Sequence, residues 1–312
     1  MKPDKSLIYP LFIPMQGCPG RCVYCDQSKI SGAGAFDLEA ARDEVRAFIR
    51  RNPARNKEVA FYGGSFTAFS EAERELILGK IGKELDEHSS FRISTHPLFI
   101  SDDILEHCAR HRVQTIELGI QDWHDAVLEA SGRGYSSEQA KLACQKIREH
   151  GFRLGIQLMP GLPGSNASTT TQNQQTLLMI KPDYLRLYPL VVIKDTPLAG
   201  EYQSGRYTAL SLKEAIQICA DYAELCRGTG IKIIKYGIPS NIADSEVLCG
   251  PYHPAFGELV KQEILIREIR RNTQPKANLD PKQLQLLRAH GCRFLEEIRI
   301  GICLDEKCGT IS

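Results

Sequence analysis

The chain has 312 residues, of which 42% are hydrophobic and 25% are charged, and both values are ordinary for a folded globular protein. This composition excludes a disordered or fibrous chain, and the length permits one large α/β domain or two domains of about 150 residues each. The 39 basic and 38 acidic residues leave a net charge of +1, so no overall field directs the protein to nucleic acid or to an anionic membrane.

The start of the chain does not resemble a targeting segment. Residues 1–5 are polar, and the apolar run at 7–14 is short and interrupted by Pro10 and Pro14. A signal peptide has a longer apolar core, and no apolar run approaches the roughly 20 residues of a membrane span. We therefore expect a cytoplasmic protein that does not enter a membrane. Cytoplasmic thiols stay reduced, so the eleven cysteines indicate metal binding, catalysis or core packing rather than disulfides.

Apolar runs of strand length alternate with amphipathic stretches of helical length along most of the chain. Strands are predicted at 8–13, 58–62, 91–95, 115–120, 153–159, 184–188 and 231–234. Helices are predicted at 38–50, 71–86, 102–110, 137–150, 169–180 and 212–227. This order is typical of βαβ units around a parallel sheet, which right-handed crossovers curl towards a barrel. Because proline donates no ladder hydrogen bond, Pro10 and Pro14 fit an edge strand, which favours an open, partial barrel over a closed ring.

The alternation ends near residue 238, where a stretch rich in proline and glycine begins. Helices are predicted beyond it at 258–271 and 281–290, followed by a last strand at 294–300. We interpret residues 1–240 as the core barrel and residues 241–312 as a small C-terminal extension packed on that barrel.

Three cysteines follow the first predicted strand: Cys18, Cys22 and Cys25 have the spacing C-x3-C-x2-C. Three thiolates on one short loop can converge on a single centre, and soft sulfur ligands select zinc, copper or an iron–sulfur cluster. Structural zinc closes with four protein ligands, whereas a 4Fe–4S cluster with one cysteine missing keeps one iron open. The spacing favours the cluster, and a non-catalytic regulatory protein that holds zinc is the alternative.

This triplet, with Tyr24 just before the third cysteine, resembles the radical S-adenosylmethionine superfamily over residues 8–238. The resemblance implies an α/β fold, a partial (β/α)6 barrel with the 4Fe–4S cluster at its mouth, whose open iron binds S-adenosylmethionine. It also implies a one-electron donor such as flavodoxin or ferredoxin. The electron cleaves the cofactor to a 5′-deoxyadenosyl radical, which abstracts a hydrogen atom from a substrate.

Other segments of the chain match the family at the ends of predicted strands. The pair Gly63-Gly64 follows the second strand and matches a glycine motif that approaches the methionine amino group. Gln121 and Arg133 match residues that contact S-adenosylmethionine in members similar to oxygen-independent coproporphyrinogen oxidase. The resemblance thus implies cofactor contacts from Tyr24, Gly63, Gly64, Ser65, Ser94, Gln121, Arg133 and Gln157. Those members carry carboxylates at the positions of Ser94 and Gln157.

Within the superfamily, residues 117–121, 159–164 and 187–198 resemble the radical domain of the Elongator catalytic subunit and its bacterial relatives. In that subunit an acetyltransferase domain follows, and the two domains modify a tRNA uridine. We expect no acetyltransferase domain in this chain, because 312 residues leave no room for one. The substrate is a small molecule or an RNA, and a radical enzyme that modifies RNA is an alternative reading.

The remaining cysteines fall into two groups. Four lie on apolar helical stripes and are predicted to pack in the core: Cys108, Cys144, Cys219 and Cys226. Four others lie in the extension, and a second metal site there is an open alternative: Cys249, Cys292, Cys303 and Cys308.

Two further features concern the substrate. The loop at 250–257 is expected to close over it at the barrel face where βα loops converge. Arg267, Arg270 and Arg271 form a basic run interleaved with Glu263 and Glu268. Mixed charge of this kind predicts a solvated helix face, with RNA binding as the alternative.

Overall fold

The computed structural model describes residues 6–13, 18, 22–26, 29–30, 34–238, 242–271 and 280–289. Its centre is one sheet of seven strands in the order β1-β2-β3-β4-β5-β6-β8, in which every pair of neighbours is parallel. The strands are β1 (Leu7–Phe12), β2 (Lys57–Tyr62), β3 (Ser89–Thr95), β4 (Val113–Gln121), β5 (Arg153–Leu158), β6 (Tyr184–Leu187) and β8 (Lys232–Tyr236).

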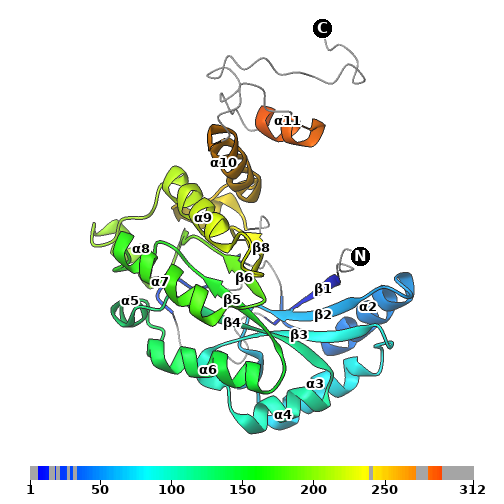
Figure 1. Ribbon diagram of the computed structural model, residues 1–312. Coiled ribbons are helices and arrows are strands. Elements are labelled where there is room, and N and C mark those ends of the chain that lie inside the picture. Colours follow the sequence, from blue (N-terminus) through cyan, green and yellow to red (C-terminus); the bar gives the residue numbers. More distant parts are fainter. Residues whose placement is uncertain are drawn as a thin grey trace.

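The sheet curls into an open half-barrel with helices around its outer face (Figure 1). Spatial order follows chain order, and β1, which contains Pro10, is an edge strand as predicted. The expected partial barrel is therefore confirmed. The helices of the barrel are α2 (Leu38–Arg51), α3 (Glu71–Gly82), α4 (Asp102–Arg110), α5 (Asp125–Ala130), α6 (Ser137–Glu149), α7 (Ala167–Ile180), α8 (Pro197–Gln203) and α9 (Leu212–Cys226), with 3-10 turns η1 (Phe66–Ala68) and η2 (Pro97–Phe99).

Serine residues define where several of these helices begin. Ser70, Ser136 and Ser211 each accept a hydrogen bond from the backbone three residues later, and the residue there reaches back to the serine backbone. Such reciprocal capping satisfies backbone donors that would otherwise lack partners at a helix start. Helix α6 begins at residue 137, as predicted, and Ser136 caps it.

The two faces of the sheet differ in chemistry. On β4, Ile116, Leu118 and Ile120 point outward into the main core, where they are fully buried between sheet and helices. Glu117, which lies between two of them, points into the half-barrel instead. Because side chains alternate along a strand, the sequence makes an apolar outer layer and a polar interior at the same time.

The four cysteines predicted for the core lie there, at Cys108, Cys144, Cys219 and Cys226. Burial raises the pKa of the Cys108 and Cys144 thiols to about 12, so these groups stay protonated and unreactive. This prediction is confirmed.

After β8 the chain runs back alongside the segment that follows β6. Strand β7 (Val192–Ile193) pairs antiparallel with β9 (Val247–Cys249), which follows η3 (Asp244–Glu246). Helix α10 (Phe256–Arg271) then packs on α9, and α11 (Pro281–Arg288) contacts α10. The strand predicted at 294–300 lies outside the described residues, and the proposed boundary at residue 240 stays a prediction.

The basic run of α10 faces α9 rather than solvent alone. Arg267 forms ion pairs with Asp221 at 2.6 Å and with Glu263 at 2.7 Å. Arg271 pairs with Glu224. Acidic residues of the protein itself thus pair with these two arginines. This pairing argues against RNA binding by this face of the helix. None of the described helices is both long and apolar enough to span a bilayer.

Leu78→Ala should lower the free energy of unfolding by about 2–5 kcal/mol, because it leaves a cavity in the core between α3 and the sheet. Leu78 is 0% exposed, whereas Leu76 on the same helix is 57% exposed. Leu76→Ala is therefore the control, with an expected change of less than about 0.5 kcal/mol. Urea unfolding of both variants measures the difference, and equal losses would contradict the described packing.

Candidate functional site

A cavity of about 580 Å³ opens at the carboxyl ends of the parallel strands. Every strand of the main sheet contributes to its wall, together with the segment that carries the cysteine triplet. All the residues that the sequence selected as metal ligands or cofactor contacts line this one cavity: Cys18, Cys22, Tyr24, Cys25, Gly63, Gly64, Ser65, Ser94, Gln121, Arg133 and Gln157. The structure thus brings them together, while the role of each residue stays a prediction.

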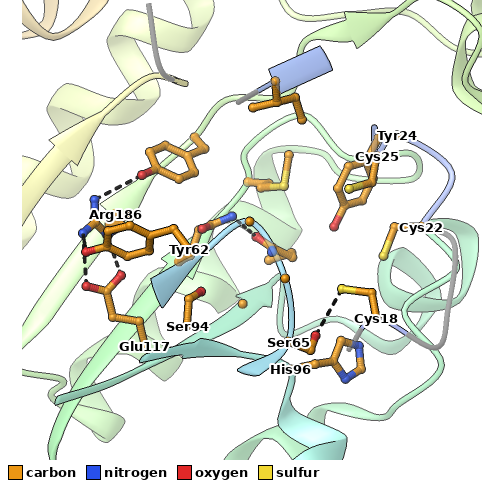
Figure 2. A pocket seen from close by; sticks show the side chains of 18 of the residues that line it. Cys18, Cys22, Tyr24, Cys25, Tyr62, Ser65, Ser94, His96, Glu117 and Arg186 are labelled. Atoms are coloured by element: carbon orange, nitrogen blue, oxygen red, sulfur yellow. Dashed lines mark hydrogen bonds and ion pairs between the residues drawn. The ribbon is translucent and has the colours of Figure 1, made fainter. Parts of the chain in front are cut away.

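The three cysteines lie on one side of the cavity, and none of them forms a disulfide (Figure 2). Cys18 Sγ lies 3.3 Å from Ser65 Oγ, which links the triplet to the turn after β2. Two backbone hydrogen bonds hold the segment in place. Val23 donates to the Ser131 carbonyl at 3.2 Å, and Leu198 at the start of α8 donates to the Val23 carbonyl at 2.8 Å.

Tyr24 forms the apolar floor beside these thiols. It is buried and packs in a second core cluster with Val127, Met159 and Leu162. Burial raises the pKa of its phenol well above the usual range, so the hydroxyl keeps its proton. The aromatic position next to the third cysteine thus shields one flank of the cavity from water.

Arg133 is a buried cation whose described partners include no carboxylate. Its Nη1 donates to Cys22 Sγ at 3.0 Å, its Nε donates to Tyr135 Oη at 3.2 Å, and its Nη2 donates to the Gly119 carbonyl. A buried charge without a counter-ion is costly. The guanidinium therefore suits a ligand that brings an anionic group, which its planar fork could bind through two oxygens.

Gly119, near the end of β4, leaves space for the end of the Gln121 side chain. A Cβ atom on Gly119 would lie 2.9 Å from Gln121 Nε2, so a larger residue there would displace the Gln121 amide. Gln121 itself has φ +68°, a left-handed conformation that is costly for a residue with a side chain. Gln157 Nε2 donates to Gln121 Oε1 at 3.1 Å, which fixes the two amides relative to each other.

His96, which the sequence analysis did not select, also lines the cavity just after β3. The Leu98 backbone donates to His96 Nδ1 at 3.4 Å, so His96 Nε2 carries the proton that it donates to the Arg133 carbonyl at 3.2 Å. Burial, together with the nearby Arg133 charge, lowers the pKa of His96 to about 3. The imidazole is therefore neutral throughout the physiological range.

On the opposite side of the cavity lie Glu117 and Arg186 (Figure 2), which belong to a network of buried ion pairs. Arg186 Nε donates to Glu117 Oε2 at 2.6 Å, and Arg92 also pairs with Glu117. Arg92 Nη2 in turn lies 2.6 Å from Glu58 Oε2. Although burial alone favours a neutral carboxyl group, Arg186 and Arg92 hold the pKa of Glu117 below its usual range. The Arg92 Cζ atom lies 4.6 Å from the centroid of the Tyr184 ring, in a cation–π contact.

Two tyrosine hydroxyls complete this side. Arg186 Nη2 donates to Tyr62 Oη at 2.6 Å, and Arg186 Nη1 donates to Tyr188 Oη at 3.2 Å. Burial raises the pKa of both phenols, so both stay protonated. A Cβ atom on Gly155 would lie 2.6 Å from Glu117 Cγ, so the glycine leaves the space that the Glu117 side chain occupies.

Sequence reasoning missed Tyr62, Arg186 and Tyr188 as site residues, although a signal was present. The run Tyr-Leu-Arg-Leu-Tyr at 184–188 alternates polar or aromatic residues with leucine. On an internal strand that pattern places Tyr184, Arg186 and Tyr188 on one face, and the leucines occupy the other face, in the core.

The loop at 250–257 does not line the cavity, so the expectation that it closes over the site is wrong in this respect. The wall on that side is formed by Leu190, Val191 and Ile193 around β7. Gly250 packs behind that wall, where a Cβ atom on it would lie 3.0 Å from the Leu190 carbonyl oxygen.

A second metal site in the extension finds no support among the described residues. Cys249 lies in β9, where its thiol forms a hydrogen bond with Tyr202. Cys292, Cys303 and Cys308 lie outside the described residues.

Comparison with known families identifies the class. Residues 12–172 match the radical SAM superfamily and residues 182–265 match the radical SAM C-terminal domain. The first match alone covers half of the chain, and the chain belongs to the radical SAM superfamily. Its members bind a 4Fe–4S cluster and S-adenosylmethionine and are generally enzymes. The resemblance seen in the sequence is confirmed.

Several relatives cover part of the chain. The tRNA uridine(34) acetyltransferase of Methanocaldococcus jannaschii is 27% identical over 171 residues, which are 54% of this chain and 31% of that protein. The heme chaperone HemW of Lactococcus lactis is 25% identical over 195 residues, 60% of this chain and 50% of that protein. The chain therefore spans at most half the length of these two relatives.

Among solved structures, the archaeal Elp3 of Methanocaldococcus infernus shares the fold with a TM-score of 0.67 at 20% identity. The match covers 85% of this chain and 64% of that chain. Methylornithine synthase has a TM-score of 0.53 at 13% identity, covering 74% of this chain and 72% of that chain.

In an NMR titration, the His96 imidazole should remain neutral from about pH 8 to about pH 5, because its pKa is about 3. In the unfolded chain histidine titrates near 6.5. Between these two values the unfolded state binds more protons, so the free energy of unfolding falls as the pH drops from about 6.5 towards about 3. His96→Gln should remove that part of the pH dependence. An imidazole that titrates near pH 6.5 in the folded protein would contradict the described burial.

Proposed function

We propose that this chain is a radical S-adenosylmethionine enzyme whose reaction takes place in the cavity at the carboxyl ends of the strands. The observation that carries the proposal is the convergence on one cavity of three cysteines outside any disulfide and a buried arginine that lacks a carboxylate partner among the described residues. Family membership supports the cofactors, and the residue roles below are part of the proposal.

Cys18, Cys22 and Cys25 are the ligands of the 4Fe–4S cluster. Their thiols face one side of the cavity, and no disulfide engages them. The donor set fits the group, because soft thiolates are the ligands that iron–sulfur clusters take. When bound, the cluster and S-adenosylmethionine supply one-electron chemistry that removes a hydrogen atom from a substrate.

The remaining residues bind and orient S-adenosylmethionine. Arg133 binds its carboxylate, which supplies the missing counter-ion, and the paired amides of Gln121 and Gln157 contact its polar groups. Gly63, with φ +87°, and Gly64 leave the backbone open to the methionine amino group. Tyr24, Ser65 and Ser94 complete the wall, and Tyr24 excludes water from the cysteine side.

The proposal includes a one-electron donor such as flavodoxin or ferredoxin and a cytoplasmic location, as expected from the sequence. RNA as the substrate is less favoured, because Arg267 and Arg271 are engaged with acidic residues of α9 and α10. A regulatory zinc protein is also less favoured, because it would leave the buried Arg133 without an anionic ligand.

Replacing Cys18, Cys22 or Cys25 with alanine should abolish the cluster, since each thiolate supplies one of three ligands. Iron and sulfide analysis after anaerobic reconstitution, with the visible absorbance, provides the measurement. Cys249→Ala is the matched control, because that thiol lies in β9 outside the cavity wall, and it should retain full iron and sulfide. A triple-alanine variant with full iron and sulfide content would refute the ligand assignment.

Arg133→Ala should retain the cluster but bind S-adenosylmethionine roughly tenfold to a hundredfold more weakly, because one charge-assisted contact is lost. Equilibrium binding to the reconstituted protein measures this change. Arg206→Ala is the control, because Arg206 is exposed, pairs with Glu201 and is not part of the cavity wall. Unchanged affinity in Arg133→Ala would rule out the carboxylate contact.

A further inference from the structure

We propose that the substrate is a small molecule with a carboxylate or phosphate group, and that this group binds Lys235 on the side of the cavity away from the cysteines. This inference rests on the proposed function, since it assigns the substrate of the same site. The cofactor occupies the cysteine side in that proposal, which leaves the β6–β8 side for the substrate.

The placement of Lys235 follows from an irregularity in strand pairing. Leu185 on β6 pairs with Ile233 on β8, but the next residue, Arg186, pairs with Lys235, so that Ile234 is passed over. Paired residues on parallel neighbours point to the same face. Because Arg186 points into the half-barrel, Lys235 does so too, and both side chains line the cavity.

Lys235 has no hydrogen bond or ion pair with any described residue. The described cavity wall contains one carboxylate, Glu117, and this group is already engaged by Arg92 and Arg186. The ammonium is half-buried and next to the Arg186 cation, and its burial together with that cation lowers its pKa. An anion in the cavity would relieve both penalties.

Neighbouring groups add donors to the same region. Arginine cannot accept a hydrogen bond, so the oxygens of Tyr62 and Tyr188 accept from Arg186. The proton of each phenol is then free to be donated to a ligand, since no described acceptor engages it. The ammonium and two hydroxyls form a set of donors with a positive charge, which is complementary to a carboxylate or phosphate.

The rest of the wall limits the size and polarity of the substrate. Phe12 lies beside Tyr62, with ring centroids 6.4 Å apart, and Leu190, Val191 and Ile193 add apolar surface to the same cavity wall. The cavity of about 580 Å³ must also hold the cofactor, which leaves space for a small molecule rather than for a folded macromolecule. The substrate therefore combines a compact, partly apolar body with one anionic group.

The test uses the reconstituted protein with its cluster and measures binding of two probes, inorganic phosphate and 3-phenylpropionate, by calorimetry. Lys235→Met should weaken the preferred probe roughly tenfold to a hundredfold, and Lys235→Arg should restore most of the affinity. The probe that loses affinity identifies the anion as phosphate or carboxylate. Lys232→Met is the matched control, because Lys232 lies on the same strand, is exposed and does not line the cavity.

A second measurement uses the wild-type protein, so it does not require that any variant folds. Limited acylation followed by mass spectrometry should show that the favoured probe protects Lys235 and leaves Lys232 unprotected. Equal probe binding by the wild type and Lys235→Met, or equal protection of both lysines, would overturn the proposal. Iron content and S-adenosylmethionine binding of the same samples test the proposed function separately, so that failure of the anion subsite and failure of the cofactor site give different results.

Discussion

The structure depends on a set of paired charges that the half-barrel holds in its interior. Helices cover the outer face of an open sheet of this kind. Its inner face borders a cavity that is neither bulk solvent nor part of the apolar core. This protein fills part of that space with an alternating chain of charges, Glu58, Arg92, Glu117 and Arg186, each within ion-pair distance of the next. Removing one member of such a chain leaves a buried charge without a partner, which costs more than the intact pairs contribute. Fold and site therefore share residues.

Small residues make this arrangement sterically feasible. Gly155 on β5 leaves room for Glu117, and Gly119 leaves room for the end of the Gln121 side chain, so β4 carries a member of the ion-pair network and also Gln121 in the cavity wall. The left-handed backbone of Gln121 is a local cost at the same place. Strain of this kind persists only where surrounding contacts determine it, and here the Gln157 amide binds the Gln121 side chain while the Met159 backbone donates to the Gln121 carbonyl at 2.8 Å.

Much of the fold was predictable because its signals are local. The alternation of strands and helices, the edge position of β1 and the buried cysteines all follow from patterns within about fifteen residues. The cysteine triplet was equally local. The short elements α5, α8, β7 and β9 were missed, because such brief segments carry little periodicity. Arg186 was missed although its strand carries a local alternation, because its ion-pair partner Glu117 lies on a distant strand. Lys235 was missed because its place in the cavity wall depends on the pairing of β8 with β6.

The irregularities in the sheet explain why that long-range part resists prediction. Register shifts occur before Arg92, between Gly119 and Gln121, and before Arg186. Each one precedes or contains a side chain that lines or supports the cavity, and such irregularities characteristically redirect side chains near functional sites. A regular register would pair Arg186 with Ile234 and remove Lys235 from its side. The cysteine side of the cavity is thus marked by motifs in the sequence, whereas the side that carries Arg186 and Lys235 depends on a register shift between two strands.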